Sequence, residues 1–127
     1  MLQPLISQRL RLGPKLYRIP DLCLIKTPYK REPILTTPPL VCIEILSPGE
    51  STVYILRKVS EYLEFGVMAA WIIDPDKQQV MCYDQDGLHY PDNKTLRLPE
   101  SGIEIDFRLL LQRTNPSLMK LGCDAAD

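Results

Sequence analysis

Residues 40–46 read Leu-Val-Cys-Ile-Glu-Ile-Leu, and a second apolar run, Ala-Ala-Trp-Ile-Ile-Asp, follows at residues 69–74. Apolar runs of this length are typical of strands that are buried on both faces of a sheet. Between them, residues 52–65 carry apolar side chains at helical spacing, which predicts an amphipathic helix. Ser47 or Ser51 is suited to cap its start, and Gly66 its end. This order predicts a right-handed βαβ crossover between two parallel strands.

Shorter strand patterns flank this unit on both sides. One is expected at residues 21–26, directly after a proline, and a hairpin is expected from strands at 79–84 and 88–90. Residues 96–112 hold a weaker strand pattern followed by a short apolar stretch. The fold class predicted is therefore α/β, with a mixed β-sheet built around a central βαβ crossover.

The chain of 127 residues is long enough for one domain, and its 12 prolines disfavour a helix bundle. We expect an irregular basic segment at 1–16, a folded domain at 17–112 and a loose tail at 113–127. No apolar run approaches 18 residues, so no membrane span is expected. The N-terminus lacks the pattern of a secretory signal, and we expect a cytoplasmic protein.

Cysteine and histidine give no recognisable metal or redox pattern. No two of the four cysteines are close in sequence, so we expect free thiols rather than a zinc or CxxC motif. His89 is the single histidine, too few for a histidine cluster, and is interpreted as a strand or turn residue. The four cysteines are Cys23, Cys42, Cys82 and Cys123.

The net charge of −1 hides an uneven distribution. Residues 1–31 carry seven basic residues against one acidic residue, a local balance of +6, and the remainder of the chain is acidic. A basic segment of this kind can attract phosphate groups. The alternative is a solvated arm whose charge is balanced by the rest of the chain.

Glu44 is the one charged residue inside the run at 40–46. A buried carboxylate must be neutralised by a metal, a basic side chain or a proton. Asp21 opens the preceding strand, and the two carboxylates can converge if those strands are neighbours. Such a pair suits Mg²⁺, or Mn²⁺, which takes one or two protein carboxylates together with water and phosphate oxygens. The alternatives are an ion pair for Glu44 and a turn role for Asp21.

Lys58 is the basic residue best placed to complete a site with these carboxylates. It lies on the helix that follows the Glu44 strand, beside the apolar face, so its stem can lie along the sheet. Lys26 is placed on the opposite face of its strand from Asp21 by alternation. The alternative for Lys58 is an exposed helix lysine that pairs with nearby glutamates.

Several short motifs, in this order and spacing, resemble the Uma-type family of restriction endonucleases. That family, long catalogued as a domain of unknown function, is similar to a branch of the PD-(D/E)XK nuclease superfamily. The resemblance covers about residues 17–107. The motifs are Pro20-Asp21, then Pro-Leu-Val-Cys-Ile-Glu-Ile-Leu-Ser-Pro at 39–48, then Lys58-x-x-x-Tyr62-x-x-x-Gly66-Val67, and then Trp71-Ile72-Ile73-Asp74-Pro75.

The resemblance implies a restriction-endonuclease-like fold and a Mg²⁺-dependent endonuclease that hydrolyses DNA. Asp21 matches the acid of the Pro-Asp motif, Glu44 matches the acid of the (D/E)XK strand, and Ile45 offers a backbone carbonyl to the metal. The lysine of that strand is replaced by Leu46, and Lys58 matches the helix lysine found in this branch. Tyr62 and Trp71 also match family positions, and their spacing indicates packing residues.

The chain departs from the family before Asp21. Family members carry a further acidic strand there, so we expect an N-terminally shortened fold. A missing strand leaves a sheet edge open, which favours a homodimer. Two alternatives to the nuclease follow: a catalytically inactive, dimeric protein of the same fold, and a nucleic-acid-binding module without hydrolysis.

Overall fold

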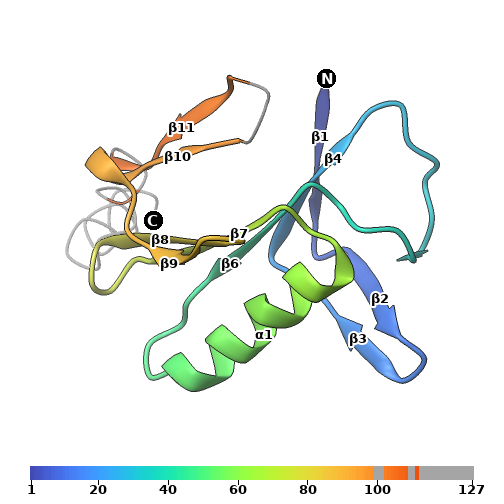
Figure 1. Cartoon of the computed structure of the whole chain (residues 1–127), viewed down its shortest axis with the longest axis horizontal. Helices are drawn as coiled ribbons and strands as arrows, with labels where there is room; N and C mark the ends of the chain where they lie inside the picture. Colours follow the sequence, from blue (N-terminus) through green and yellow to red (C-terminus); the bar gives the residue numbers. More distant parts are fainter. Residues whose placement is uncertain (99–101, 109–110, 112–127) are drawn as a thin grey trace, which may run out of the picture.

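The computed structural model describes residues 1–98, 102–108 and 111. Its main element is a six-stranded mixed sheet in which β6 and β7 are parallel and the other neighbours antiparallel. Helix α1, Thr52–Phe65, connects β6 to β7, so the predicted mixed α/β fold and βαβ crossover are confirmed (Figure 1). In spatial order the strands are β1 (Leu2–Ile6), β4 (Leu22–Lys26), β6 (Val41–Ile45), β7 (Ala69–Asp74), β8 (Gln79–Asp84) and β9 (Gly87–His89).

The ends of α1 are fixed by the residues that the sequence suggests. Ser51 has extended backbone angles, and its Oγ accepts a hydrogen bond from the Tyr54 N–H, which caps the first turn. Gly66 ends the helix with φ at 120°, and its N–H donates to the carbonyls of Tyr62 and Leu63. A side chain at Gly66 would also lie 2.9 Å from Pro38, so glycine is required there on two counts.

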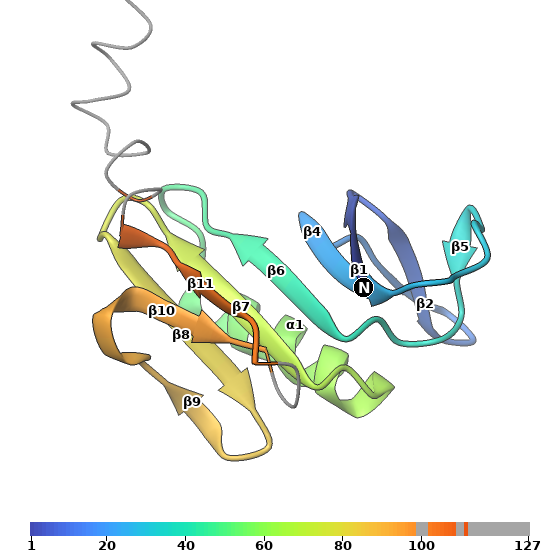
Figure 2. The same cartoon turned by 90° about the horizontal axis from the view of Figure 1, so that it is seen from above.

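The sheet lies between two layers. Successive residues of each strand point to opposite faces of the sheet, so each face packs against a layer of its own. On one face lie α1 and a three-stranded sheet of β2 (Arg9–Gly13), β3 (Leu16–Arg18) and β5 (Ile34–Leu35). On the other face lies the hairpin of β10 (Thr95–Arg97) and β11 (Glu104–Asp106), which follows the short helix η1 (Asp92–Lys94). Figure 2 shows α1 and the β10–β11 hairpin on opposite sides of β6 and β7.

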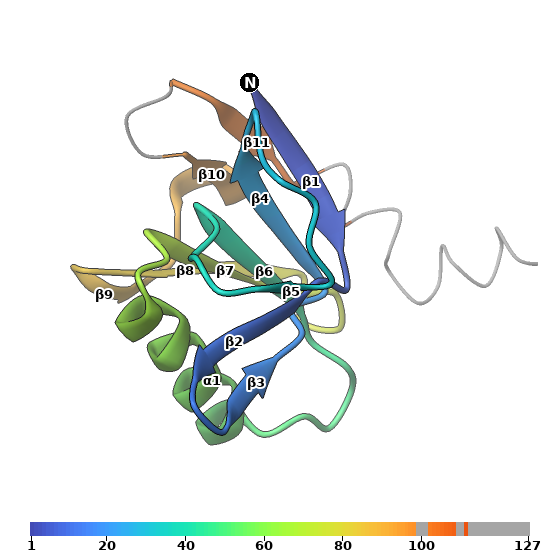
Figure 3. The ribbon, with the colours of Figure 1, turned by 90° about the vertical axis from the view of Figure 1, so that its right-hand side faces the viewer.

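The expectation of an irregular segment at 1–16 is wrong, because β1 and β2 lie within it. β1 pairs with β4 along its whole length, and β2 is paired by both β3 and β5 (Figure 3). Both strands are only five residues long. β1 reads Leu-Gln-Pro-Leu-Ile and has no clear alternation, whereas β2 reads Arg-Leu-Arg-Leu-Gly and alternates over too few residues to stand out beside Gly13-Pro14. Pro4 is tolerated in β1 because that strand lies at the sheet edge.

β1 also changes the argument for a dimer. It pairs with β4 at one edge of the sheet, whereas we expected the N-terminal segment to add no strand and to leave a sheet edge open. The homodimer therefore stays a prediction without that support. The domain bounds 17–112 and the cytoplasmic location also stay predictions, and residues 113–127 lie outside the described residues.

Two further observations concern the described part of the chain. No described helix is long and apolar enough to cross a membrane. Cys23, Cys42 and Cys82 are buried free thiols, as the sequence predicts, and Cys123 lies outside the described residues.

Candidate active site

Strand register brings Asp21 and Glu44 together. In the antiparallel pair of β4 and β6, Leu22 lies opposite Ile43, so one further step places Asp21 beside Glu44. The Asp21 Oδ2 accepts a 2.7 Å hydrogen bond from the backbone N–H of Ile45. The two residues thus lie side by side at one end of the strand pair, where Asp21 is exposed and Glu44 is buried.

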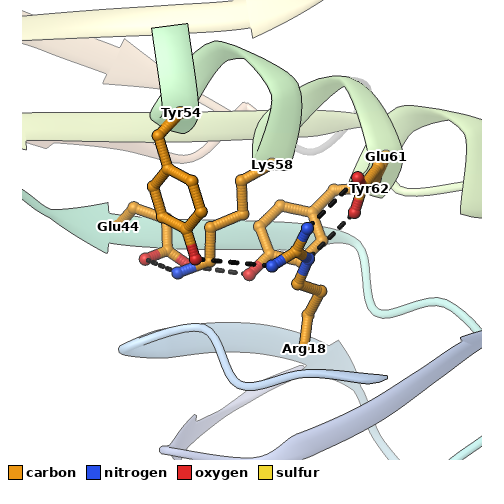
Figure 4. Close-up of polar contacts among 6 residues, drawn as sticks. All are labelled: Arg18, Glu44, Tyr54, Lys58, Glu61 and Tyr62. Atoms are coloured by element: carbon orange, nitrogen blue, oxygen red, sulfur yellow. Dashed lines mark hydrogen bonds and ion pairs between the residues drawn. The ribbon is translucent and has the colours of Figure 1, made fainter. Parts of the chain in front are cut away.

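Glu44 receives one donor on each carboxylate oxygen, and both donors come from α1 (Figure 4). The Tyr62 hydroxyl donates to Oε1 at 2.6 Å, and the Lys58 ammonium donates to Oε2 at 3.2 Å. Tyr62 follows Lys58 by four positions, which places both side chains on one face of the helix. The buried carboxylate is therefore satisfied within the protein.

Burial raises the pKa of Glu44, because the charged form loses its contact with water. The hydrogen bond from Tyr62 and the charge of Lys58 lower that pKa, and the nearby charge of Asp21 raises it, but burial has the largest effect. Burial, followed by the charge of Glu44, also raises the pKa of Tyr62. Tyr62 therefore stays a hydroxyl donor at any ordinary pH.

A second set of polar contacts holds α1 against the β2–β3 hairpin. Arg18 donates from Nε and from a terminal nitrogen to the two carboxylate oxygens of Glu61, at 2.8 and 3.1 Å. Its other terminal nitrogen lies 3.4 Å from the Tyr54 hydroxyl. Lys58 and Arg18 each lie 5.9 Å from the centre of the Tyr54 ring, so both cations can interact with that ring.

The structure brings three of the predicted site residues together, namely Asp21, Glu44 and Lys58. Ile45 is the last residue of β6, and its contact with Asp21 is made by its backbone N–H, not by the carbonyl expected to face a metal. The ion pair with Lys58 is also the alternative that the sequence left open for Glu44.

Tyr62 packs in the core, as its spacing predicts, and its hydroxyl has a further role that was not predicted, the contact with Glu44. The i, i+4 spacing from Lys58 is the sequence signal that could have found it. Trp71 does pack: it is fully buried on the opposite face of the sheet, edge-on to Phe107 at 6.4 Å between ring centres. The sequence marks Arg18 only as one of the basic residues of the N-terminal third. No local sequence pattern indicates that it pairs with Glu61 of α1.

The fold and the paired carboxylates together define a restriction-endonuclease-like protein. Residues 3–111 match the Uma2 family, described as "putative restriction endonuclease", and this chain belongs to that family. A crystal structure of a "putative nuclease belonging to DUF820" from Anabaena variabilis ATCC 29413 has the same fold, with a TM-score of 0.72 at 20% sequence identity. The similarity covers 89% of this chain and 69% of that one. No curated protein matches the chain.

Proposed function

We propose that this protein is an endonuclease that hydrolyses phosphodiester bonds of DNA with the help of Mg²⁺ or Mn²⁺. Asp21, Glu44 and the backbone carbonyl of Ile45 would hold the ion, and Lys58 would orient or activate the attacking water. The observation that carries the proposal is the convergence of Asp21 and Glu44 at one strand end, with the Lys58 ammonium 3.2 Å from Glu44. Membership of the Uma2 family supports a nuclease in general.

The donor set fits a hard divalent cation. All the candidate ligand atoms are oxygens, which Mg²⁺ prefers. A carboxylate has about four lone-pair sites, and Tyr62 and Lys58 each engage one oxygen of Glu44, so further sites remain for a cation. When bound, such an ion polarises the phosphate and lowers the pKa of a bound water.

The protein's own residues would then have distinct roles. Tyr62 fixes the rotamer of Glu44 through its short hydrogen bond and carries no charge itself. Lys58 lies where its ammonium can hold a water molecule or a phosphate oxygen once it leaves Glu44. Asp21 is exposed, so it lies on the side from which a nucleic acid would approach.

The basic N-terminal third would bind the phosphate backbone of the substrate. Of its seven cations, Arg18 is paired with Glu61, and the other six are exposed. Among the described residues, none of these six forms an ion pair with a carboxylate. Their charge therefore remains available to DNA. The six are Arg9, Arg11, Lys15, Lys26, Lys30 and Arg31.

A second candidate is a protein of this fold that binds nucleic acid without cleaving it. The observation in its favour is that both Glu44 oxygens already have donors and only 5% of the Glu44 side chain is exposed. An internal ion pair of this kind neutralises the carboxylate without a metal. A protein of this second kind would keep the basic surface that binds DNA and would lack only the hydrolysis of phosphodiester bonds.

A plasmid-nicking assay separates the two candidates. We expect supercoiled DNA to be nicked with Mg²⁺ or Mn²⁺ and not with a chelator, and we expect Glu44→Ala and Asp21→Asn to abolish nicking. Glu64→Ala is the matched control, because Glu64 is an exposed glutamate of the same helix. DNA binding in a gel shift without any nicking by the wild-type protein would favour the second candidate.

We also propose that the protein forms a homodimer. β1 and β9 are the edge strands of the main sheet, and an edge strand presents unpaired backbone groups to a second chain. Light scattering at high micromolar concentration should give the mass of two chains. A mass of one chain at that concentration would contradict the proposal.

A further inference from the structure

The β8–β9 hairpin gathers three different metal-binding side chains on one face. In this antiparallel pair Cys82 lies directly opposite His89, so both side chains point to the same side. Asp84 follows Cys82 by two positions in β8 and therefore shares that face. This is the face that packs towards β10 and β11, opposite to the face that carries Glu44 and α1.

The ligand atoms of these residues are close together. One atom from each residue can be chosen so that all three lie within 4.8 Å of one another. The Cys82 Sγ and the His89 Nε2 each lie 3.8 Å from the Asp84 Oδ2. Bonds of 2.0–2.3 Å in a tetrahedral zinc site separate ligand atoms by roughly 3.3–3.8 Å. The present spacing needs only a small adjustment of side chains to reach that value.

The three side chains also line a pocket of about 270 Å³, whose other wall includes Pro91, Asp92 and Thr95. Cys82 is buried in the floor of the pocket, while Asp84 is half-buried and His89 is exposed. An ion on these three ligands would keep one position open towards the pocket. That position has room for water or for a small anionic ligand.

We propose that Cys82, Asp84 and His89 form a zinc-binding site with three protein ligands and an open fourth position. Sulfur, imidazole and carboxylate in one set favour Zn²⁺ over Mg²⁺, which prefers oxygen ligands throughout. The site is independent of the candidate active site, because the two lie on opposite faces of the sheet. The sequence spacing Cys-x-Asp-x₄-His is not a common zinc motif, and only the hairpin register brings the three residues together.

The test uses the full chain with Zn²⁺, and with Co²⁺ as a spectroscopic probe. Titration calorimetry should give one Zn²⁺ per chain, and Co²⁺ should give a charge-transfer absorption that requires a thiolate ligand. At a hundredfold excess over the dissociation constant, Zn²⁺ should raise the melting temperature by roughly 5–15 °C. His89→Gln and Asp84→Asn should weaken Zn²⁺ and Co²⁺ binding at least about tenfold, so that the cobalt–thiolate band needs a correspondingly higher Co²⁺ concentration.

Two control variants make the result specific. Asp86→Asn makes the same charge change as Asp84→Asn at an exposed position of the same hairpin turn, and it should leave Zn²⁺ binding unchanged. Glu44→Gln alters the opposite face and should also leave it unchanged. The absence of stoichiometric Zn²⁺ binding by the wild-type protein would overturn the proposal. Equal binding by His89→Gln and wild type, or loss of binding in Glu44→Gln alone, would overturn it as well.

Discussion

The Tyr62 hydroxyl lies 2.6 Å from Oε1 of Glu44, and this is the shortest contact that either carboxylate of the candidate active site makes. It joins the last turn of α1 to the penultimate residue of β6, so the contact depends on how the helix packs on the sheet. A hydroxyl that donates to a buried carboxylate stabilises the charged form. Tyr62 therefore links the stability of the domain to the ionisation of Glu44.

Replacing Tyr62 with Phe should show this link directly. The variant keeps the ring and removes the donor, so we expect the free energy of unfolding to fall by about 1.5–3 kcal/mol at neutral pH. Tyr54→Phe is the matched control on the same helix, because the Tyr54 hydroxyl makes only a 3.4 Å contact with Arg18. Urea unfolding measures both variants, and equal losses would contradict a specific role for the Tyr62 hydroxyl.

Replacing Glu44 with Gln tests whether the charge of Glu44 destabilises the folded protein when no metal is bound. The raised pKa of Glu44 means that burial disfavours the carboxylate more than Lys58 and Tyr62 favour it. In chelator we therefore expect Glu44→Gln to keep or raise the melting temperature, and to abolish any stabilisation by Mn²⁺ or Mg²⁺. If the Lys58 pair dominates instead, the variant should lose about 3–5 kcal/mol, because the lysine is left without its partner.

The pH dependence of stability follows from the same raised pKa. In the pH range between the ordinary value of 4.5 and the raised value, the folded protein keeps a proton on Glu44 that the unfolded chain has lost. The contribution of Glu44 to the free energy of unfolding is therefore fully present below pH 4.5, and it is lost as the pH rises through the pKa of Glu44 in the folded protein.

We expect wild type to lose stability relative to Glu44→Gln over that range in chelator. Stabilisation by Mg²⁺ should grow over the same range, because the metal requires the carboxylate. Denaturant melts of both proteins at several pH values measure these effects. A stability difference that does not vary with pH would show that Lys58 and Tyr62 together cancel the effects of burial and of the Asp21 charge.

The salt dependence of DNA binding should report the exposed cations of the N-terminal third. Each phosphate contact contributes about 0.9 to the slope of log affinity against log salt. Replacing both Arg9 and Arg11 with Gln should therefore reduce the slope by up to about 2. Arg108→Gln is the control, since Arg108 is exposed but already paired with Asp106. An unchanged slope in the double variant would exclude these arginines from the DNA contact.

Arg18 and Glu61 should be worth more to stability than an exposed pair with the same contact distance. Their side chains are only 18% and 19% exposed, and the guanidinium makes two hydrogen bonds to Glu61. Arg18→Lys removes the two-pronged geometry and should cost about 1–2 kcal/mol. Arg97→Lys is the control, because Arg97 also lies 2.8 Å from a glutamate but is 76% exposed, and it should cost under about 0.5 kcal/mol.

The central part of the fold could be predicted from the sequence because its signals are local. The strands β7 and β8 and the helix α1 have the predicted bounds, since each has a clear apolar period and a residue that ends it. The short strands β2, β3 and β5 were not predicted. β2 does alternate, as Arg-Leu-Arg-Leu, but β3 and β5 have only three and two residues. All three strands are stabilised by pairing with each other and by packing of Leu10 and Leu35 against the main sheet, which depends on residues distant in the sequence.

The candidate active site could also be predicted only in part. Glu44 could be singled out because a carboxylate interrupts an apolar run. Asp21 could be singled out because it opens a strand that was expected to lie beside the strand of Glu44. The donor role of Tyr62 could not be read from its own position, since a tyrosine on an apolar helix face is compatible with packing alone. The grouping of Cys82 with His89 depends on hairpin register, which the sequence indicates only through the Asp86-Gly87 turn.

The placement of both Glu44 donors on α1 has a consequence for how the site can change. A helix moves as a rigid body, so backbone motion cannot take Lys58 away from Glu44 and leave Tyr62 in place. A displacement of α1 removes both donors at once and leaves an unpaired carboxylate, which then takes up a proton or a cation. Residues 46–51 join β6 to α1, so a change in the length of that connection would alter both donors of Glu44 without changing either donor residue.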